Sequence, residues 1–147
     1  MKTKVHAAAG ITGFLCILLF WTSTTVSELF GFYDDITGVK NMILNGMLIL
    51  IPAMMVVGAS GMSLGAKRKD PMSQAKKKRM PIIGLNGILV LVPSAFFLAS
   101  KANAGEFDTA FYSVQAIELI AGALNLTLMG LNTRDGLRMT GRIKRKR

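Results

Sequence analysis

Four long apolar segments, almost free of charged residues, constrain the fold more than any other feature of this sequence. They cover residues 5–26, 41–66, 80–100 and 109–131, and the last of them contains one acidic residue, Glu118. Each segment reaches the length of about 20 residues that a helix needs to cross roughly 30 Å of hydrocarbon. A lone strand cannot satisfy its backbone hydrogen bonds in lipid. The predicted fold class is therefore all-α, a four-helix transmembrane bundle.

The basic residues are distributed very unequally between the two predicted sides of the membrane. All but two of the 18 Lys and Arg residues lie before the first segment, between the second and third, or after the fourth. Lys40 and Lys101 are the exceptions, and they share the opposite side with most of the acidic residues. This positive-inside pattern predicts a multi-pass membrane protein with both termini cytoplasmic. It also argues against nucleic-acid binding, despite the net charge of +10.

The same pattern predicts that residues 1–147 form a single integral membrane domain. The predicted spans are about 5–28, 39–65, 80–101 and 108–133. A basic cytoplasmic loop, 66–79, joins the two middle spans, and a basic tail, 134–147, follows the last one. Because anionic headgroups attract such basic segments, membrane lipids are predicted partners.

The two middle spans contain near copies of one motif, LNGMLILIP at 44–52 and LNGILVLVP at 85–93. Pro52 and Pro93 fall near the middle of their spans and are predicted to kink them, since each removes one backbone hydrogen bond. The carbonyl four residues earlier then needs a side chain, a water or a local rearrangement as its partner. Because the two helices run in opposite directions, the copies fit either convergent packing or a remnant of an inverted transporter repeat.

Polar side chains form one face of the fourth predicted span, where Gln115, Glu118, Asn125 and Asn132 follow one another at helical spacing. A carboxyl group about 15 Å inside a span is costly and marks a candidate functional site. This topology puts every basic residue at a membrane surface. Glu118 therefore has no predicted cation partner and is expected to be uncharged.

Asn45 and Asn86, from the repeated motif, extend this predicted intramembrane polar stripe. Three interpretations of the stripe stay open. It forms a buried hydrogen-bond network that fixes helix packing, a path for protons or a ligand, or a contact with a partner subunit.

His6 is the single histidine and lies at the start of the first predicted helix. No cysteine pair or carboxylate cluster accompanies it, so no metal site is predicted. The spacing from His6 to Gly10, followed by Phe20 and Trp21, resembles the first helix of small b-type cytochrome-like membrane proteins. That resemblance covers the first helix only. It implies haem b held by His6, with a Met or the His6 of a second copy as the other axial ligand; no other cofactor is predicted.

A second resemblance rests on four short stretches: HA at 6–7, FWTST at 20–24, RMP at 79–81 and RDG at 134–136. Through them the whole chain resembles an uncharacterised class of small proteobacterial four-helix inner-membrane proteins. The resemblance implies the fold and the location, and it brings no activity with it.

No catalytic triad, phosphate-binding loop or dinucleotide fingerprint can be placed on the sequence, so no catalytic residues are predicted. Three functional hypotheses follow. The first is a non-enzymatic accessory or interaction subunit, in a homo-oligomer or a larger membrane complex. The second is a haem-binding redox protein that uses His6, and the third is a small proton-coupled transporter that uses Glu118 and acts as an oligomer.

Overall fold

The computed structural model describes residues 2–66 and 68–141, and within these ranges the chain is all-α. The elements are α1 (Lys2–Phe30), α2 (Tyr33–Gly65), α3 (Pro71–Asn86), η1 (Gly87–Leu91), α4 (Val92–Asn103) and α5 (Thr109–Met139). The consecutive elements α3, η1 and α4 form one continuous helical unit. The described chain thus has four units long and apolar enough to cross a membrane, which confirms the predicted four-helix bundle. Much of the predicted basic tail, 142–147, lies outside the described residues, as does residue 67.

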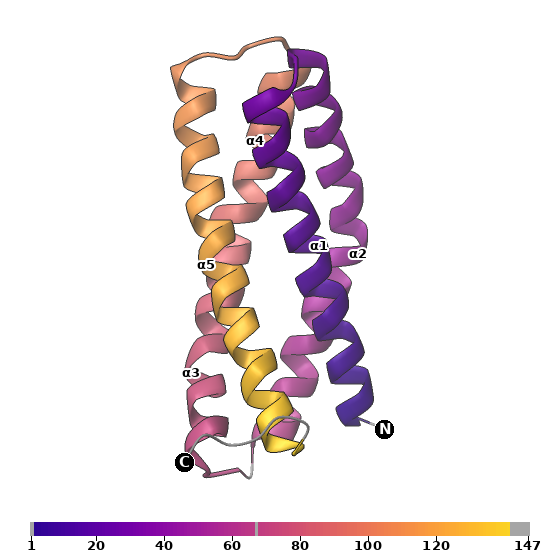
Figure 1. The fold of residues 1–147 in the computed structure, drawn as a ribbon, viewed down its shortest axis with the longest axis vertical. Helices are drawn as coiled ribbons and strands as arrows, with labels where there is room; N and C mark the ends of the chain where they lie inside the picture. The colour runs from indigo at the N-terminus through magenta and orange to yellow at the C-terminus, as the bar shows by residue number, and fades with distance from the viewer. Residues whose placement is uncertain (1, 67, 142–147) are drawn as a thin grey trace.

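The four units form an antiparallel ring (Figure 1). Helix α1 packs on α2 and α5, and the third unit also packs on α2 and α5. Within the described chain, the backbones of the diagonal pair α2 and α5 do not approach each other. The start of α1, the connection from α2 to α3 and the end of α5 lie at one end, here called the basic end. The other two turns form the acidic end.

The third unit begins at Pro71, inside the segment predicted to be a loop. The Asp70 side chain accepts a hydrogen bond of 3.0 Å from the Ser73 N–H, and this bond holds the pKa of Asp70 below its usual range. Pro71 fits the first turn because no intrahelical donor is needed there. Lys76 and Arg79 therefore project from a helix and not from a solvated loop.

Pro52 and Pro93 differ in their effect on the backbone. Ahead of Pro93 the helix widens into η1, a five-residue π-helix in which the Val92 N–H bonds the Gly87 carbonyl. Such a π-segment is one form of the local rearrangement expected near a proline in lipid. Around Pro52, by contrast, α2 continues as a regular α-helix.

The helices pack through three layers of apolar side chains, and the outer surface of the ring is apolar as well. Leu48 and Ile120 are 78% and 72% exposed, as expected for side chains that face lipid. Gly46 of the repeated motif lets α1 approach α2, because a Cβ there would lie 2.3 Å from Phe20 Cζ. The buried members of the layers are Ile36, Leu98, Ala102 and Phe111; Ile43, Met47 and Ala95; and Ile17, Ile83 and Met129.

Candidate functional site

The Lys40 side chain of α2 is the most deeply buried charged group in the described chain, at 1% exposed. Its ammonium donates to Glu118 Oε2 at 3.1 Å and to Gln115 Oε1, both on α5. The Gln115 amide donates in turn to Glu118 Oε2 at 3.0 Å. Because α2 and α5 are diagonal in the ring, Lys40 spans the interior of the bundle and joins two helices whose backbones do not meet.

The expectation that Glu118 has no cation partner is therefore wrong. Lys40 immediately precedes a charge-free segment, and the topology assigned it to the membrane surface. The structure instead directs its side chain inward, where it forms an ion pair with Glu118, whose side chain is 12% exposed. Attraction in a low-dielectric interior offsets the cost of removing both charges from water, provided that the remaining polar atoms are hydrogen-bonded.

Glu28 of α1 completes this group, which we call the Lys40 cluster (Glu28, Lys40, Gln115 and Glu118). The Glu28 Oε1 atom is buried and has no hydrogen-bond partner among the described residues. The cluster thus holds two carboxyl groups and one ammonium, of which only Glu118 is paired with Lys40. With both carboxyl groups ionised, one additional proton would make the cluster neutral overall.

A small cavity lies beside the Lys40 cluster, with Glu118 in its wall. Its volume is about 50 Å³, and most of its wall is apolar. The Trp21 indole lines the same cavity and donates to the Leu119 carbonyl at 2.9 Å, which fixes α1 against α5. Gly122 makes room for that indole, because a Cβ there would lie 2.9 Å from Trp21 Cδ1.

Asn125, 1% exposed, forms a second buried polar group with Asn86, here called the Asn125 cluster. Asn86 donates to Asn125 Oδ1 at 2.9 Å and to the Ala121 carbonyl at 2.8 Å. Asn125 donates to the Ile83 carbonyl at 3.3 Å. These bonds join α3 to α5 near the middle of the bundle.

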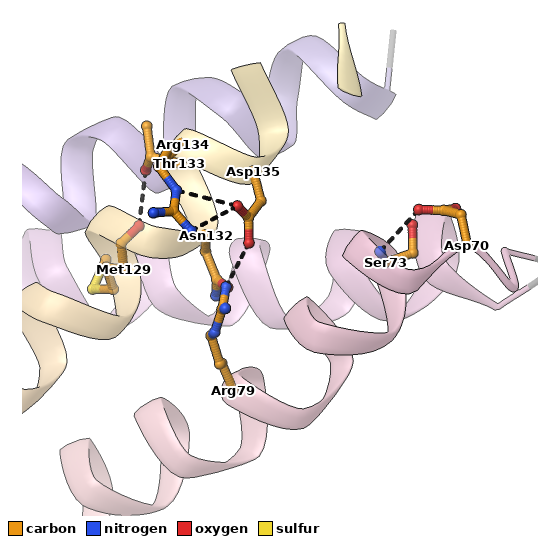
Figure 2. A network of polar contacts seen from close by, with 8 residues as sticks. All are labelled: Asp70, Ser73, Arg79, Met129, Asn132, Thr133, Arg134 and Asp135. Carbon is orange, nitrogen blue, oxygen red and sulfur yellow. Dashed lines mark hydrogen bonds and ion pairs between the residues drawn. The ribbon is translucent and has the colours of Figure 1, made fainter. Parts of the chain in front are cut away.

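A third polar group, the Asp135 cluster, joins α3 to α5 at the basic end (Figure 2). Arg79 donates to Asp135 Oδ2 at 2.7 Å and to Asn132 Oδ1 at 3.4 Å. Arg134 donates to the other Asp135 oxygen at 3.2 Å. The predicted stripe residue Asn132 thus belongs to an ionic network around Asp135, whose side chain is only 7% exposed.

Asn45 is the predicted stripe residue that the structure does not bring into the interior. It is exposed on α2, and its amide makes no hydrogen bond within the described chain. Lys40 reaches the level of Glu118, and Asn45 lies five residues further along α2, or about 7.5 Å deeper. The repeated motif thus has two different environments: Asn86 is hydrogen-bonded inside the bundle, whereas Asn45 faces outward.

His6 lies at the basic end, with its Nδ1 atom 2.9 Å from the Ser60 hydroxyl. The same hydroxyl donates to the Val56 carbonyl of its own helix. His6 lines a cavity of about 650 Å³, here called the basic cavity. The haem hypothesis stays a prediction. Among the described residues, no three His, Cys, Asp or Glu side chains come together as metal ligands.

The described chain is thus a bundle of four helices long and apolar enough to cross a membrane, with polar clusters between its apolar layers. No protein-family model matches the chain, and no curated protein or solved structure shows a significant match to it.

Proposed function

We propose that the protein is a non-enzymatic interaction subunit of a bacterial inner-membrane assembly and that α2 is its docking helix. The observation that supports this function is the outward-facing Asn45 amide within an apolar span. An amide without a hydrogen bond in an apolar medium costs several kcal/mol. Asn side chains commonly relieve that cost by bonding across a helix–helix contact.

The surface around Asn45 fits a partner helix of this kind. Its neighbours Leu48, Pro52 and Met55 are exposed and apolar. Pro52 also leaves the Leu48 carbonyl without its usual backbone donor. A partner that offers one donor and one acceptor to α2 would satisfy both groups while the surrounding side chains pack in lipid.

The basic end is assigned to the cytoplasm in this proposal. Arg68, Lys76 and Arg79 lie between α2 and α3 or at the start of α3, at that end, whereas Asp34 and Asp108 lie at the starts of α2 and α5, at the opposite one. Membrane proteins retain Lys and Arg on the cytoplasmic side, which supports a chain with both termini inside.

Photo-crosslinking in native membranes tests the docking helix. A photoreactive residue at Ile49, exposed near Asn45, is expected to form an adduct with a protein. Asn45→Leu should reduce the yield about fivefold or more, because an interhelical hydrogen bond contributes about 1–2 kcal/mol. The matched control is Thr127→Val, which removes an exposed hydroxyl bonded only to its own helix. Adducts with lipid alone, or an equal yield in Asn45→Leu, would refute the docking role.

The Lys40 cluster favours a second candidate function, proton-coupled transport by an oligomer. It contains two carboxyl groups and one ammonium, with Glu118 paired to Lys40 and Glu28 Oε1 buried without a partner among the described residues, and Glu118 borders a small cavity. Such a cluster can take up and release a proton inside the membrane if water reaches it.

Proton flux into liposomes tests this second function. Wild-type protein is expected to give flux above that of empty liposomes, and Glu118→Gln should abolish it while still accepting a hydrogen bond from Lys40. Glu106→Gln is the matched control, since Glu106 is exposed at the acidic end. Wild-type flux equal to that of empty liposomes would exclude this function.

A further inference from the structure

The basic cavity lies between the ends of α1, α2 and α5 and the start of α3, at the basic end of the bundle. Its volume of about 650 Å³ falls within the 300–1,000 Å³ typical of ligand sites. This space is far larger than the one beside Glu118, and it is not part of the polar clusters described above.

The cavity wall has two chemically distinct parts. One part is apolar, with Met62, Met80, Leu85 and Ile88 in the wall. The other is basic, with Arg68, Lys76 and Lys77. A ligand that fits both parts has an anionic group joined to an apolar chain.

The Lys76 ammonium is the group in the cavity wall that most needs an anionic partner. Its side chain is partly buried, and its ammonium has no hydrogen bond or ion pair to another described residue. Asp135, an acidic group at this end, is already paired with Arg79 and Arg134. Lys77 donates only to the Arg68 carbonyl, so its positive charge is also without a counter-ion among the described residues.

The hollow shape depends on glycines. At Gly58 and Gly84, both in the wall, an added Cβ would meet no atom within 4 Å. The absence of side chains at these positions leaves room for a chain that enters from the surrounding lipid, because both glycines belong to membrane-length helices.

We propose that the basic cavity binds an anionic phospholipid, with its phosphate at Lys76 and Lys77 and an acyl chain along Leu85 and Ile88. The position suits this ligand, since basic pockets between transmembrane helices on the cytoplasmic side bind anionic headgroups. The lipid would fill the gap between α2 and α3 and neutralise the unpaired cations of the basic end.

Native mass spectrometry of the full chain, released from nanodiscs of equal phosphatidylglycerol and phosphatidylcholine, tests the proposal. Wild-type protein is expected to retain phosphatidylglycerol. The double variant Lys76→Gln/Lys77→Gln should bind it roughly 30-fold more weakly, because each Lys near an anionic lipid contributes about a factor of five. The charge-matched control is Lys69→Gln/Lys78→Gln, whose residues do not line the cavity.

A second variant separates a specific site from general charge attraction. Gly84→Leu fills open space and keeps every cation, so it should fold, bind soluble headgroup as before and lose the retained lipid. Equal loss in both charge variants, retention in Gly84→Leu, or displacement by millimolar inorganic phosphate would overturn the proposal. A Soret band in the purified protein that disappears in Gly84→Leu would also overturn it, since haem would then occupy the cavity.

Discussion

Replacing Lys40 with Met is expected to lower the free energy of unfolding by about 3–5 kcal/mol, the usual effect of removing one partner from a buried ion pair. The substitution keeps the apolar stem but removes the cation paired with the Glu118 carboxylate, which keeps only the Gln115 amide as a donor, and it leaves the Gln115 carbonyl without its donor. The loss of helical circular dichroism in mixed micelles, followed against rising sodium dodecyl sulfate, measures the change.

Lys101→Met provides a control with the same chemical change. Lys101 pairs with Glu106 and Asp108, whose side chains are 57% and 51% exposed. Surface ion pairs add little to stability, so this variant should unfold close to wild type. The double variant Lys40→Met/Glu118→Gln should recover part of the loss, because the unpaired carboxylate is gone. Equal unfolding of Lys40→Met and Lys101→Met would show that Lys40 is not buried.

Asn125→Leu is expected to destabilise the bundle by about 2 kcal/mol, the cost of leaving buried polar groups unsatisfied. It removes the acceptor of Asn86 and the donor to the Ile83 carbonyl at once, although Leu is close to Asn in size. The same unfolding assay measures it. Thr127→Val, two residues away and exposed, should stay near wild type, and a comparable loss there would indicate a general effect of removing polar groups from α5.

The existence of four membrane-length helices could be predicted from the sequence because hydrocarbon thickness fixes how long an apolar span must be. The start of the third unit was harder to predict. Apolar runs mark the hydrocarbon boundary, whereas the helix begins where Asp70 and Pro71 cap it in water. The helix therefore extends well beyond the predicted span 80–101, and it positions Arg79 to bind Asp135.

The partner of Glu118 was missed, although the sequence contained a signal for it. Lys40 follows Ile36 by four residues and precedes Ile43 by three, so it occupies the face of α2 that is buried. The positive-inside rule treats Lys40 only as a residue of a surface turn and takes no account of its helical spacing. A long side chain at the edge of a span can point inward when a carboxyl group faces it from another helix.

The repeated motif could not predict the different positions of Asn45 and Asn86. Identical local sequence fixes local backbone preferences, but the facing of each helix depends on which neighbours flank it in the ring. Asn86 lies on the third unit, next to α5 and its polar face. Asn45 lies on α2, which is diagonal to α5, and it faces away from the interior. Pro93 likewise has a π-segment before it, whereas Pro52 does not.

Solid-state NMR of the protein in lipid bilayers tests the buried Lys40–Glu118 ion pair directly, through dipolar coupling between Lys ¹⁵Nζ and Glu ¹³Cδ. The Lys40 ammonium lies 3.1 Å from the Glu118 carboxylate, so a Glu106→Gln background, which removes the surface pair with Lys101, should still show strong coupling. Adding Glu118→Gln should remove that coupling. Absence of coupling in the Glu106→Gln background, or its persistence without Glu118, would contradict a Lys40 side chain that crosses the bundle to α5.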